Sequence, residues 1–247
     1  MIAIRRSVLA LTVLFAASVL ASEPQGETMN EGETVSDAAV SKNPAMRPIE
    51  DVPGLPRVLL IGDSISIGYT TPVRDLLKGK ANVHRIPNNG QSTAIGLLKL
   101  DRWLGDTKWD VIHFNFGVHD AKYLTETETK VSRADYEKNL RELVKRLRAT
   151  GAKLVFATTT PVPAVLEPPT RRFDSIPERN AIAVRVMQEN GVVVDDLYAV
   201  VLPQQEQLQR PKDVHFLPAG SDLLARAVAA SIETELPKTG TSSGGMP

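Results

Sequence analysis

The stretch VLLIGDSISIGY, residues 58–69, runs from an apolar segment straight into small polar residues. A short continuous apolar run bounded by a turn signal is typical of a strand that is buried on both faces of a sheet. The residues that follow lead into a helix that includes Pro72 to Leu77. A buried strand that turns directly into a helix is the start of a strand–helix–strand unit, so this stretch predicts a parallel sheet.

The same alternation of strand and helix patterns continues toward the C-terminus. The five predicted strands are RVLLIG (57–62), ANVHRI (81–86), WDVIHFNF (109–116), AKLVFATTT (152–160) and GVVVDD (191–196). The clearest helical period lies in residues 132–151, and the last helix is expected near Ser221 to Leu236. This order predicts an α/β fold with a single doubly wound domain, in which helices cover both faces of a five-stranded parallel sheet.

The two ends of the chain differ from this central part. Residues 1–21 combine two early arginines with an apolar run that ends in small residues, the pattern of a secretory signal peptide cut after Ala21. An uncleaved membrane anchor is the alternative, although the run is shorter than the ~20 residues of a spanning helix. Residues 22–56 are acidic and Pro-rich without an apolar period, which predicts a disordered linker. We expect the folded domain at 57–237, a flexible tail at 238–247, and export to the periplasm or the cell exterior.

Composition excludes several classes of function. The 247 residues include 29 basic and 29 acidic ones, so no net charge favours nucleic acid or an anionic membrane surface. We therefore expect no nucleic-acid partner and no stable membrane insertion. The chain has no cysteine, which excludes disulfides, a thiol nucleophile and thiolate metal sites. A nucleophile in this protein must be an oxygen or a nitrogen, and the oligomeric state is not predicted.

Ser64 stands at the turn between the first predicted strand and its helix. In an open α/β sheet, ligands gather outside the carboxyl ends of the strands, so residues at this turn are candidates for a site. A serine here can hold its hydroxyl over the sheet edge, where the helix N-terminus favours developing negative charge. Serine is also a common N-cap residue. The local sequence leaves both interpretations open.

Two other segments follow predicted strands. They are NNG (88–90) and GVHD (117–120). Glycine at position 90 lets the backbone approach a ligand, although Asn-Gly is also an ordinary turn signal. His119 and Asp120 could ligate a metal, but an adjacent pair without a third ligand is a weak signature, so no metal site is predicted.

A serine hydroxyl becomes a nucleophile when a neighbouring base takes its proton. His215 lies in the segment KDVHF (212–216), just before the last predicted helix, and Asp213 stands close to it. A histidine and an aspartate in one loop have the ingredients of a general base and its orienting acid. His84 and His113 lie inside predicted strands, where a packing or surface role is the default. His215 is therefore the candidate base.

Taken in order, GDSIS, NNG, GVHD and DVHF resemble the four sequence blocks of the SGNH, or GDSL, hydrolase family. The likeness extends from Val58 to about Ile232, and it implies the flavodoxin-like SGNH hydrolase fold. A short motif supports membership of a family when its structural context agrees with that family. Here each block follows an expected strand or precedes the last helix. The resemblance implies that Ser64 is the nucleophile and that its own N–H, with the N–H of Gly90, holds the oxyanion. It assigns the general base to His215.

Two blocks depart from the family pattern. The third block usually supplies an asparagine as the remaining oxyanion donor, where this chain has His119, which can donate if the ring nitrogen facing the oxyanion is protonated. The fourth block is usually D-x-x-H, but Lys212 holds the position three before His215, and Asp213 stands two before it. In an extended loop this spacing would splay Asp213 away from His215, leaving a Ser–His dyad as the alternative to a triad.

The resemblance implies a serine esterase, a carboxylic ester hydrolase that works through a Ser64 acyl-enzyme without a cofactor. Together with the predicted signal peptide, this predicts a secreted enzyme. Few aromatic residues and no evident apolar lid favour small acyl esters, with acetyl groups on carbohydrate as the specific expectation. Residues 119–134 and 161–176 are candidate substrate walls, with ordinary surface loops as the alternative. A rival hypothesis is a catalytically impaired glycan-binding protein on the same fold. Another is a flavodoxin-like module that holds a phosphate at the helix after GDSIS.

Overall fold

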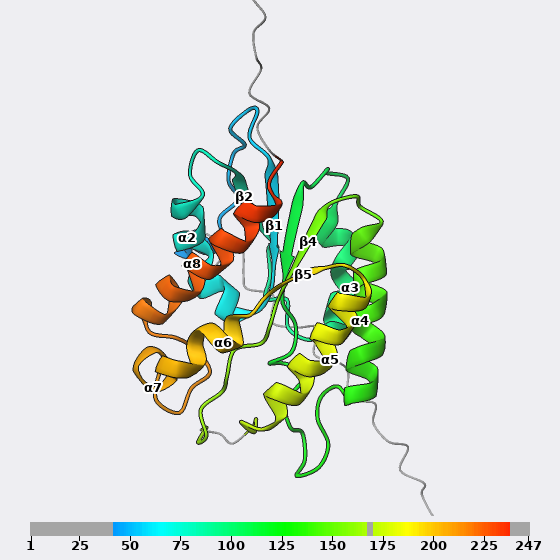
Figure 1. The fold of residues 1–247 in the computed structure, drawn as a ribbon, viewed down its shortest axis with the longest axis vertical. Coiled ribbons are helices and arrows are strands. Elements are labelled where there is room, and N and C mark those ends of the chain that lie inside the picture. The colour runs from blue at the N-terminus through cyan, green and yellow to red at the C-terminus, as the bar shows by residue number, and fades with distance from the viewer. Residues whose placement is uncertain (1–41, 167–169, 238–247) are drawn as a thin grey trace, which may run out of the picture. The chain divides into compact units, whose positions relative to one another are not determined.

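The sheet is built from five parallel strands in the order β2-β1-β3-β4-β5 (Figure 1). The computed structural model describes residues 42–166 and 170–237. The predicted signal peptide, the predicted C-terminal tail and the predicted linker as far as residue 41 lie outside these residues. Within them, the chain has the doubly wound α/β arrangement that the sequence predicted.

Each strand is shorter than the sequence run that predicted it. The strands are β1 (Arg57–Ile61), β2 (Asn82–Arg85), β3 (Val111–Phe114), β4 (Lys153–Ala157) and β5 (Val193–Asp195). The residues left out of the strands include polar ones at the carboxyl ends, such as Asn115 and Thr158, whose side chains donate to the carbonyl of Ala157 and to Asp196 Oδ1. These shortened ends are the positions from which the candidate site residues project.

Helices cover both faces of the sheet. Leu59 and Ile61 of β1 face α3 (Thr93–Leu104), α4 (Arg133–Arg148) and α5 (Ser175–Glu189). Val58 and Leu60 face α2 (Ser64–Leu76), α6 (Leu197–Val201) and α8 (Pro218–Glu235). Alternate residues of a strand point to opposite faces, so a strand covered on both sides must be apolar throughout.

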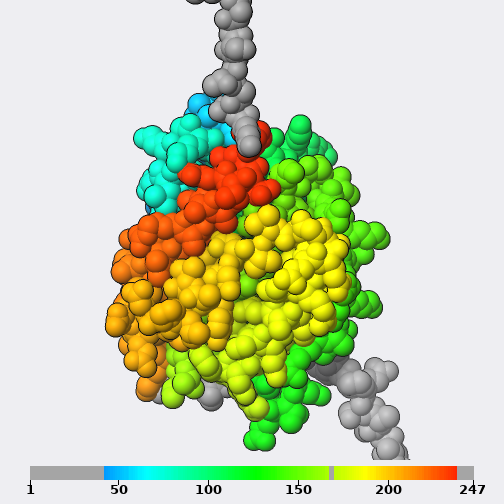
Figure 2. Space-filling model, viewed as in Figure 1, coloured from blue at the N-terminus to red at the C-terminus, as the bar shows by residue number. Residues whose placement is uncertain are grey.

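The C-terminal helix α8 lies against α2 on one face of the sheet, and Figure 2 shows its side chains on the surface of that side. The connection from β5 to α8 contains α6 and two further short helices, η2 (Leu202–Gln204) and α7 (Gln205–Leu208). No helix among the described residues is long and apolar enough to cross a membrane.

The predicted linker ends earlier than the boundary at residue 56. A short helix, η1 (Pro44–Met46), packs on α2, and its Met46 is buried. Farther along, the N–H of Val52 donates to Asn82 Oδ1 of β2 at 2.9 Å, and Asp51 pairs with Arg57 at 2.7 Å. Within residues 44–56, Ala45 and Met46 are buried and Asp51 and Val52 contact the domain, while most of the other residues are exposed. Composition could not show these contacts, because two adjacent buried residues do not make an apolar period.

Candidate active site

Ser64 is the first residue of α2. Asp63 is the N-cap, because its Oδ1 accepts a hydrogen bond from the N–H of Ile65 at 2.9 Å. The capping role that the sequence left open for Ser64 therefore belongs to Asp63. The backbone N–H of Ser64 lies at the helix N-terminus, where the first N–H groups have no acceptor within the helix and carry partial positive charge.

The imidazole of His215 joins Ser64 to Asp213. His215 Nε2 lies 2.8 Å from Ser64 Oγ, and His215 Nδ1 lies 2.7 Å from Asp213 Oδ1. A carboxylate can only accept, so Nδ1 carries the ring proton and donates it to Asp213. Nε2 then has its lone pair free to accept the hydrogen bond that the Ser64 hydroxyl donates. This is the hydrogen-bond order of a serine nucleophile, its base and an orienting acid.

Asp213 reaches His215 because the loop between them is not extended. The N–H of Arg210 donates to the carbonyl of His215 at 2.9 Å, and the N–H of Asp213 donates to the carbonyl of Arg210 at 3.2 Å. Lys212 takes a positive φ of 59°, which turns the chain back on itself. The turn brings Asp213 under the imidazole, so the splayed geometry expected for an extended loop does not occur.

The pKa of Asp213 lies below its usual value. Burial acts to raise this pKa, but the hydrogen bonds from His215 and its charge outweigh burial. The carboxylate therefore stays ionised at pH values where free aspartate begins to take up a proton. The stabilisation that comes from this shift is present above the ordinary pKa and is lost as the pH falls through the lowered one.

Gly90 sits against the nucleophile turn, but its N–H is engaged. It donates to the carbonyl of Gly62 at 2.9 Å. A Cβ at this position would lie 2.8 Å from the same carbonyl oxygen, so the close approach requires glycine. An oxyanion would have to share or displace this bond, and the role of Gly90 as an oxyanion donor stays a prediction.

The third block forms a turn after β3. Gly117 has a φ of 155°, and a Cβ there would lie 2.1 Å from Thr159 Oγ1, which explains the glycine. Asp120 is fully buried and accepts hydrogen bonds from the N–H and the hydroxyl of Thr93, at the start of α3. Burial raises the pKa of Asp120 to about 6 despite these bonds. Asp120 thus fixes the turn on which His119 stands.

The side chain of His119 has no hydrogen-bond partner within residues 42–166 and 170–237. Burial lowers the pKa of His119, and the charge of Asp63 opposes the shift while Arg171 and two lysines add to it. The ring is therefore neutral at neutral pH, with one N–H donor and one acceptor. It can serve as an oxyanion donor if the nitrogen facing the oxyanion carries the proton, and this role also stays a prediction.

Sequence reasoning missed Arg85, which ties two of the blocks together. Its Nη2 donates to the carbonyls of Gly62 and Asp63 at 2.8 and 2.9 Å and to Ser66 Oγ at 2.7 Å. Its Nη1 donates to the carbonyl of Asn88 at 2.9 Å. Burial lowers the pKa of Arg85 to about 10, so the guanidinium remains charged at neutral pH. Because β2 also contains Asn82 and His84, the sequence offered no signal that set Arg85 apart from other polar residues of the strand.

We expect Arg85→Met to lower the rate of serine chemistry by about 10²-fold, because a small displacement of a reacting group has effects of this size. Arg74→Met is the matched control. Arg74 also donates to three backbone carbonyls, those of Val83, Pro44 and Arg47, but these lie outside the four blocks. The measurement is the labelling rate with a fluorophosphonate, beside the thermal midpoint of each variant. Equal loss of labelling in both variants would show that Arg85 matters for stability alone.

A groove of about 490 Å³ opens beside Ser64 and His215. Its walls come from α2, from the start of α8 and from the loop before α8, and they include Gly68, Arg210 and Asp222. A larger hollow of about 720 Å³ lies between the loop of residues 123–133, α4 and α5, and it shares no lining residue with the groove. Among the described residues, no group of three or more histidines and carboxylates is placed to hold a metal ion.

The sequence and the fold were compared with those of known proteins. The sequence model of the GDSL-like lipase/acylhydrolase family matches residues 60–223. No curated protein matches the sequence. Among solved structures, a lipase/acylhydrolase from Enterococcus faecalis superposes with a TM-score of 0.65 at 22% identity, covering 74% of this chain and 98% of that one.

Two acetyl xylan esterases have the same fold. For the enzyme AlAXEase the TM-score is 0.62 at 18% identity, with 71% of this chain and 99% of that chain covered. For Axe2 from Geobacillus stearothermophilus the TM-score is 0.59 at 20% identity, with 72% and 94% covered. At these identities the likeness shows a common fold.

Proposed function

Since this chain belongs to the GDSL-like lipase/acylhydrolase family, we propose that it is a serine esterase that uses Ser64 as its nucleophile. The observation that carries the proposal is the unbroken hydrogen-bond chain from Ser64 Oγ through His215 to Asp213, at 2.8 and 2.7 Å. Distances of this size are those expected between a nucleophile, its base and the group that orients the base.

In the first half of the reaction, His215 Nε2 takes the proton of Ser64 as Oγ attacks the ester carbonyl. Asp213 keeps the Nδ1 proton in place and stabilises the imidazolium that forms. The oxyanion lies at the N-terminus of α2, where the N–H of Ser64 donates to it. Collapse of the tetrahedral intermediate passes the proton from His215 to the leaving alcohol and leaves the acyl group on Ser64. Water then attacks this acyl group with His215 again as the base. The bond between the acyl carbon and Ser64 Oγ breaks, His215 returns the proton to Oγ, and the carboxylic acid leaves.

The substrate we propose is a small acyl ester, with an acetyl group on carbohydrate as the specific case. Two acetyl xylan esterases share the fold. The groove beside Ser64 has polar and charged side chains, including those of Arg210, Ser221 and Asp222, which can bond to hydroxyl groups of a carbohydrate. It also has apolar side chains, including those of Ile67 and Phe216, against which an acyl group can pack.

The experiment that tests this function compares hydrolysis of p-nitrophenyl acetate, butyrate and octanoate with release of acetate from acetylated xylo-oligosaccharides. We expect the acetate ester to be the best of the three, and acetate to be released from the oligosaccharide. Turnover that rises with chain length would point to a lipid ester and contradict the acetyl proposal while leaving the serine mechanism intact.

We expect His119→Ala to lower kcat by about 10²- to 10³-fold, the usual effect of losing one oxyanion donor. His119→Asn should retain most of the activity, because an asparagine amide places an N–H donor at a similar distance from the backbone. His84→Ala is the control. His84 lies on β2 and pairs with Asp51, and neither residue belongs to the four sequence blocks. Equal activity of His119→Ala and the parent protein would exclude His119 from the oxyanion site.

A glycan-binding protein without turnover is the second candidate. The bond between the Gly90 N–H and the Gly62 carbonyl favours it, because this bond occupies a donor that the family mechanism needs. It predicts a folded protein that binds oligosaccharide yet takes up no fluorophosphonate on Ser64.

We also propose that the protein is exported, on the basis of the sequence of residues 1–21. The mature protein should begin at Ser22. Intact-mass measurement of the protein recovered from outside the cytoplasm tests this expectation, and a mass that retains residues 1–21 would contradict it.

A further inference from the structure

The groove beside Ser64 and His215 runs along α2. Ser64, Gly68 and Pro72 all line it, and because they are four residues apart they follow one another along one side of the helix. The helical rise places Pro72 about 12 Å from Ser64 along the helix axis. An acetyl group needs only a small part of this length, so the rest of the groove is open to the alcohol part of an ester.

The opposite wall of the groove belongs to α8, which lies beside α2 (Figure 1), and to the loop before it. Ser221 and Asp222 of α8 and Arg210 of the loop line this wall. The two helices come close at Gly68, where a Cβ would lie 3.2 Å from Ser221 Oγ. A side chain at position 68 would fill the gap between the walls, so glycine keeps the groove open along α2.

Pro72 removes the helical donor of a carbonyl in this groove. Proline has no backbone N–H, so Pro72 cannot donate the regular helical hydrogen bond to the carbonyl of Gly68, four residues earlier. Gly68 is exposed and has no side chain that could cover this carbonyl. The carbonyl is therefore an acceptor for a ligand that carries O–H groups.

The polar side chains of the opposite wall are also available to a ligand. Within residues 42–166 and 170–237, the side chains of Arg210, Ser221 and Asp222 make no hydrogen bond or ion pair with another residue. Arg210 and Asp222 carry opposite charges, yet they do not pair with each other. Together they offer donors and acceptors without net charge, which suits an uncharged ligand that both accepts and donates hydrogen bonds.

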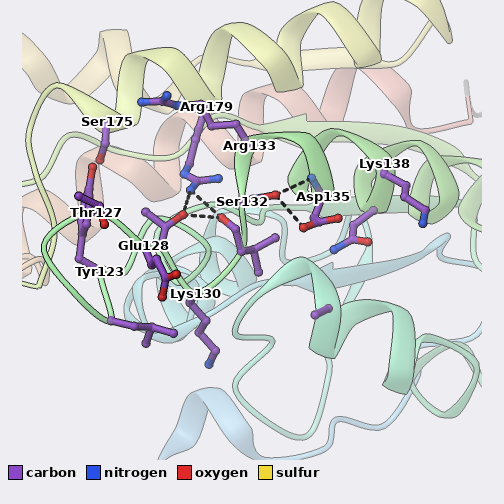
Figure 3. Close-up of a pocket in the computed structure, with 15 residues that line it drawn as sticks. Tyr123, Thr127, Glu128, Lys130, Ser132, Arg133, Asp135, Lys138, Ser175 and Arg179 are labelled. Atoms are coloured by element: carbon purple, nitrogen blue, oxygen red, sulfur yellow. Dashed lines mark hydrogen bonds between the residues drawn. The ribbon is translucent and has the colours of Figure 1, made fainter.

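The larger hollow of about 720 Å³ is a poorer place for the substrate, because it shares no lining residue with the groove. Figure 3 shows polar side chains of this hollow bonded to one another. Arg179 reaches from α5 to Thr129 Oγ1 at 2.9 Å, and Ser132 bonds to Asp135 at the start of α4. Of these two hollows, only the groove adjoins the proposed catalytic groups.

We propose that the groove between α2 and α8 binds the alcohol part of the substrate and that Arg210 and Asp222 determine its specificity. The ligand is an uncharged carbohydrate chain of at least two sugar rings, acylated on the ring next to Ser64. Asp222 and the carbonyl of Gly68 accept hydrogen bonds from its hydroxyl groups, and Arg210 donates to its oxygen atoms. This inference rests on the proposed esterase function and narrows its substrate class.

The test measures kcat/KM for acetylated xylotetraose, acetylated xylose and p-nitrophenyl acetate. We expect the tetramer to be favoured over the monosaccharide by about tenfold, because only the tetramer fills the groove. Asp222→Ala and Arg210→Ala should each lower kcat/KM for the tetramer by about tenfold, mainly by raising KM. The effect on p-nitrophenyl acetate should be smaller, since its alcohol carries no sugar hydroxyl.

Two exposed or half-buried charges away from the groove give matched controls. Glu235→Ala removes a negative charge from the other end of α8, and Arg102→Ala removes a positive charge from α3, on the other face of the sheet. Equal kcat/KM for tetramer and monosaccharide in the parent protein would overturn the inference. So would equal effects of Asp222→Ala and Glu235→Ala on the tetramer.

Pro72→Ala tests the carbonyl of Gly68. Alanine restores the N–H that engages this carbonyl within the helix, and it suits a helix interior better than proline, so the thermal midpoint should rise. We expect kcat/KM for the tetramer to fall by about fivefold all the same, because a ligand hydroxyl loses its acceptor. A fall at a raised midpoint cannot come from loss of structure, and an unchanged kcat/KM would refute the role of the carbonyl.

A binding measurement separates this inference from the proposed function. Calorimetric titration of the intact protein with unacetylated xylotetraose needs no turnover. Binding that is weakened in Asp222→Ala but not in Glu235→Ala supports the groove even if no ester is hydrolysed. Esterase activity without any binding of xylotetraose, or with equal binding in both variants, would leave the proposed function standing and refute the groove as the carbohydrate site.

Discussion

Ser64→Ala is expected to lower ester hydrolysis by about 10⁶-fold and to abolish labelling by a fluorophosphonate. The alanine has no hydroxyl, so His215 Nε2 loses the group that lies 2.8 Å from it, and no acyl-enzyme can form. The remaining activity would come from water attacking an ester that the oxyanion donors still polarise. The measurement is intact-mass analysis after labelling, beside initial rates with p-nitrophenyl acetate.

Ser66→Ala is the informative comparison for Ser64→Ala. Ser66 lies two residues farther along α2, and its hydroxyl donates to the carbonyl of Asp63 and accepts from Arg85. This change removes a hydrogen bond but leaves the nucleophile, so one adduct should still form. An adduct on Ser64→Ala at the parental rate would place the reactive group elsewhere and refute the mechanism.

Asp213→Asn is expected to lower kcat by about 10⁴-fold while KM changes little. The carboxylate can only accept from His215 Nδ1, whereas an amide can turn its NH₂ group toward the ring. The ring then carries its proton on Nε2 and cannot take the proton of Ser64. Loss of the negative charge also removes the stabilisation of the imidazolium that forms in the transition state.

Asp75→Asn is the control for this change, because it also removes one negative charge, from the exposed side of α2. Near-parental activity of Asp213→Asn, with a parental thermal midpoint, would mean that the protein works as a Ser–His dyad. It would also mean that the 2.7 Å contact between Asp213 and His215 is dispensable.

The fold could be predicted from the sequence because the apolar residues of each strand and helix follow a local, periodic pattern. Apolar runs such as VLLI in β1 can only be buried strands when helical patterns follow them, and strands joined through helices must run parallel. Ser64 and His215 were predictable for a related reason. The ends of parallel strands meet at one edge of the sheet, so a serine after β1 and a histidine before α8 were expected to come close.

What the sequence could not predict depends on backbone conformation in turns. The reach of Asp213 to His215 follows from the positive φ of Lys212, a residue type that seldom adopts this conformation. The contact between Gly90 and Gly62 depends on how closely two loops approach, and no spacing rule specifies that distance. Arg85 resembled any polar residue at the end of a strand until its hydrogen-bond partners were known.

The loop that carries Asp213 and His215 also decides how the protein would respond to heat. It is closed by hydrogen bonds between its own ends, including the bond from Leu217 N–H to the carbonyl of Leu208 at 2.8 Å. Proteins open in small cooperative units before they unfold globally, and surface loops are among the first to open. Opening here would remove base and acid in a single step, while Ser64 stays on α2. Such an opening would have to expose Val214 and Phe216, which are buried, and it would inactivate the protein while the sheet stays folded.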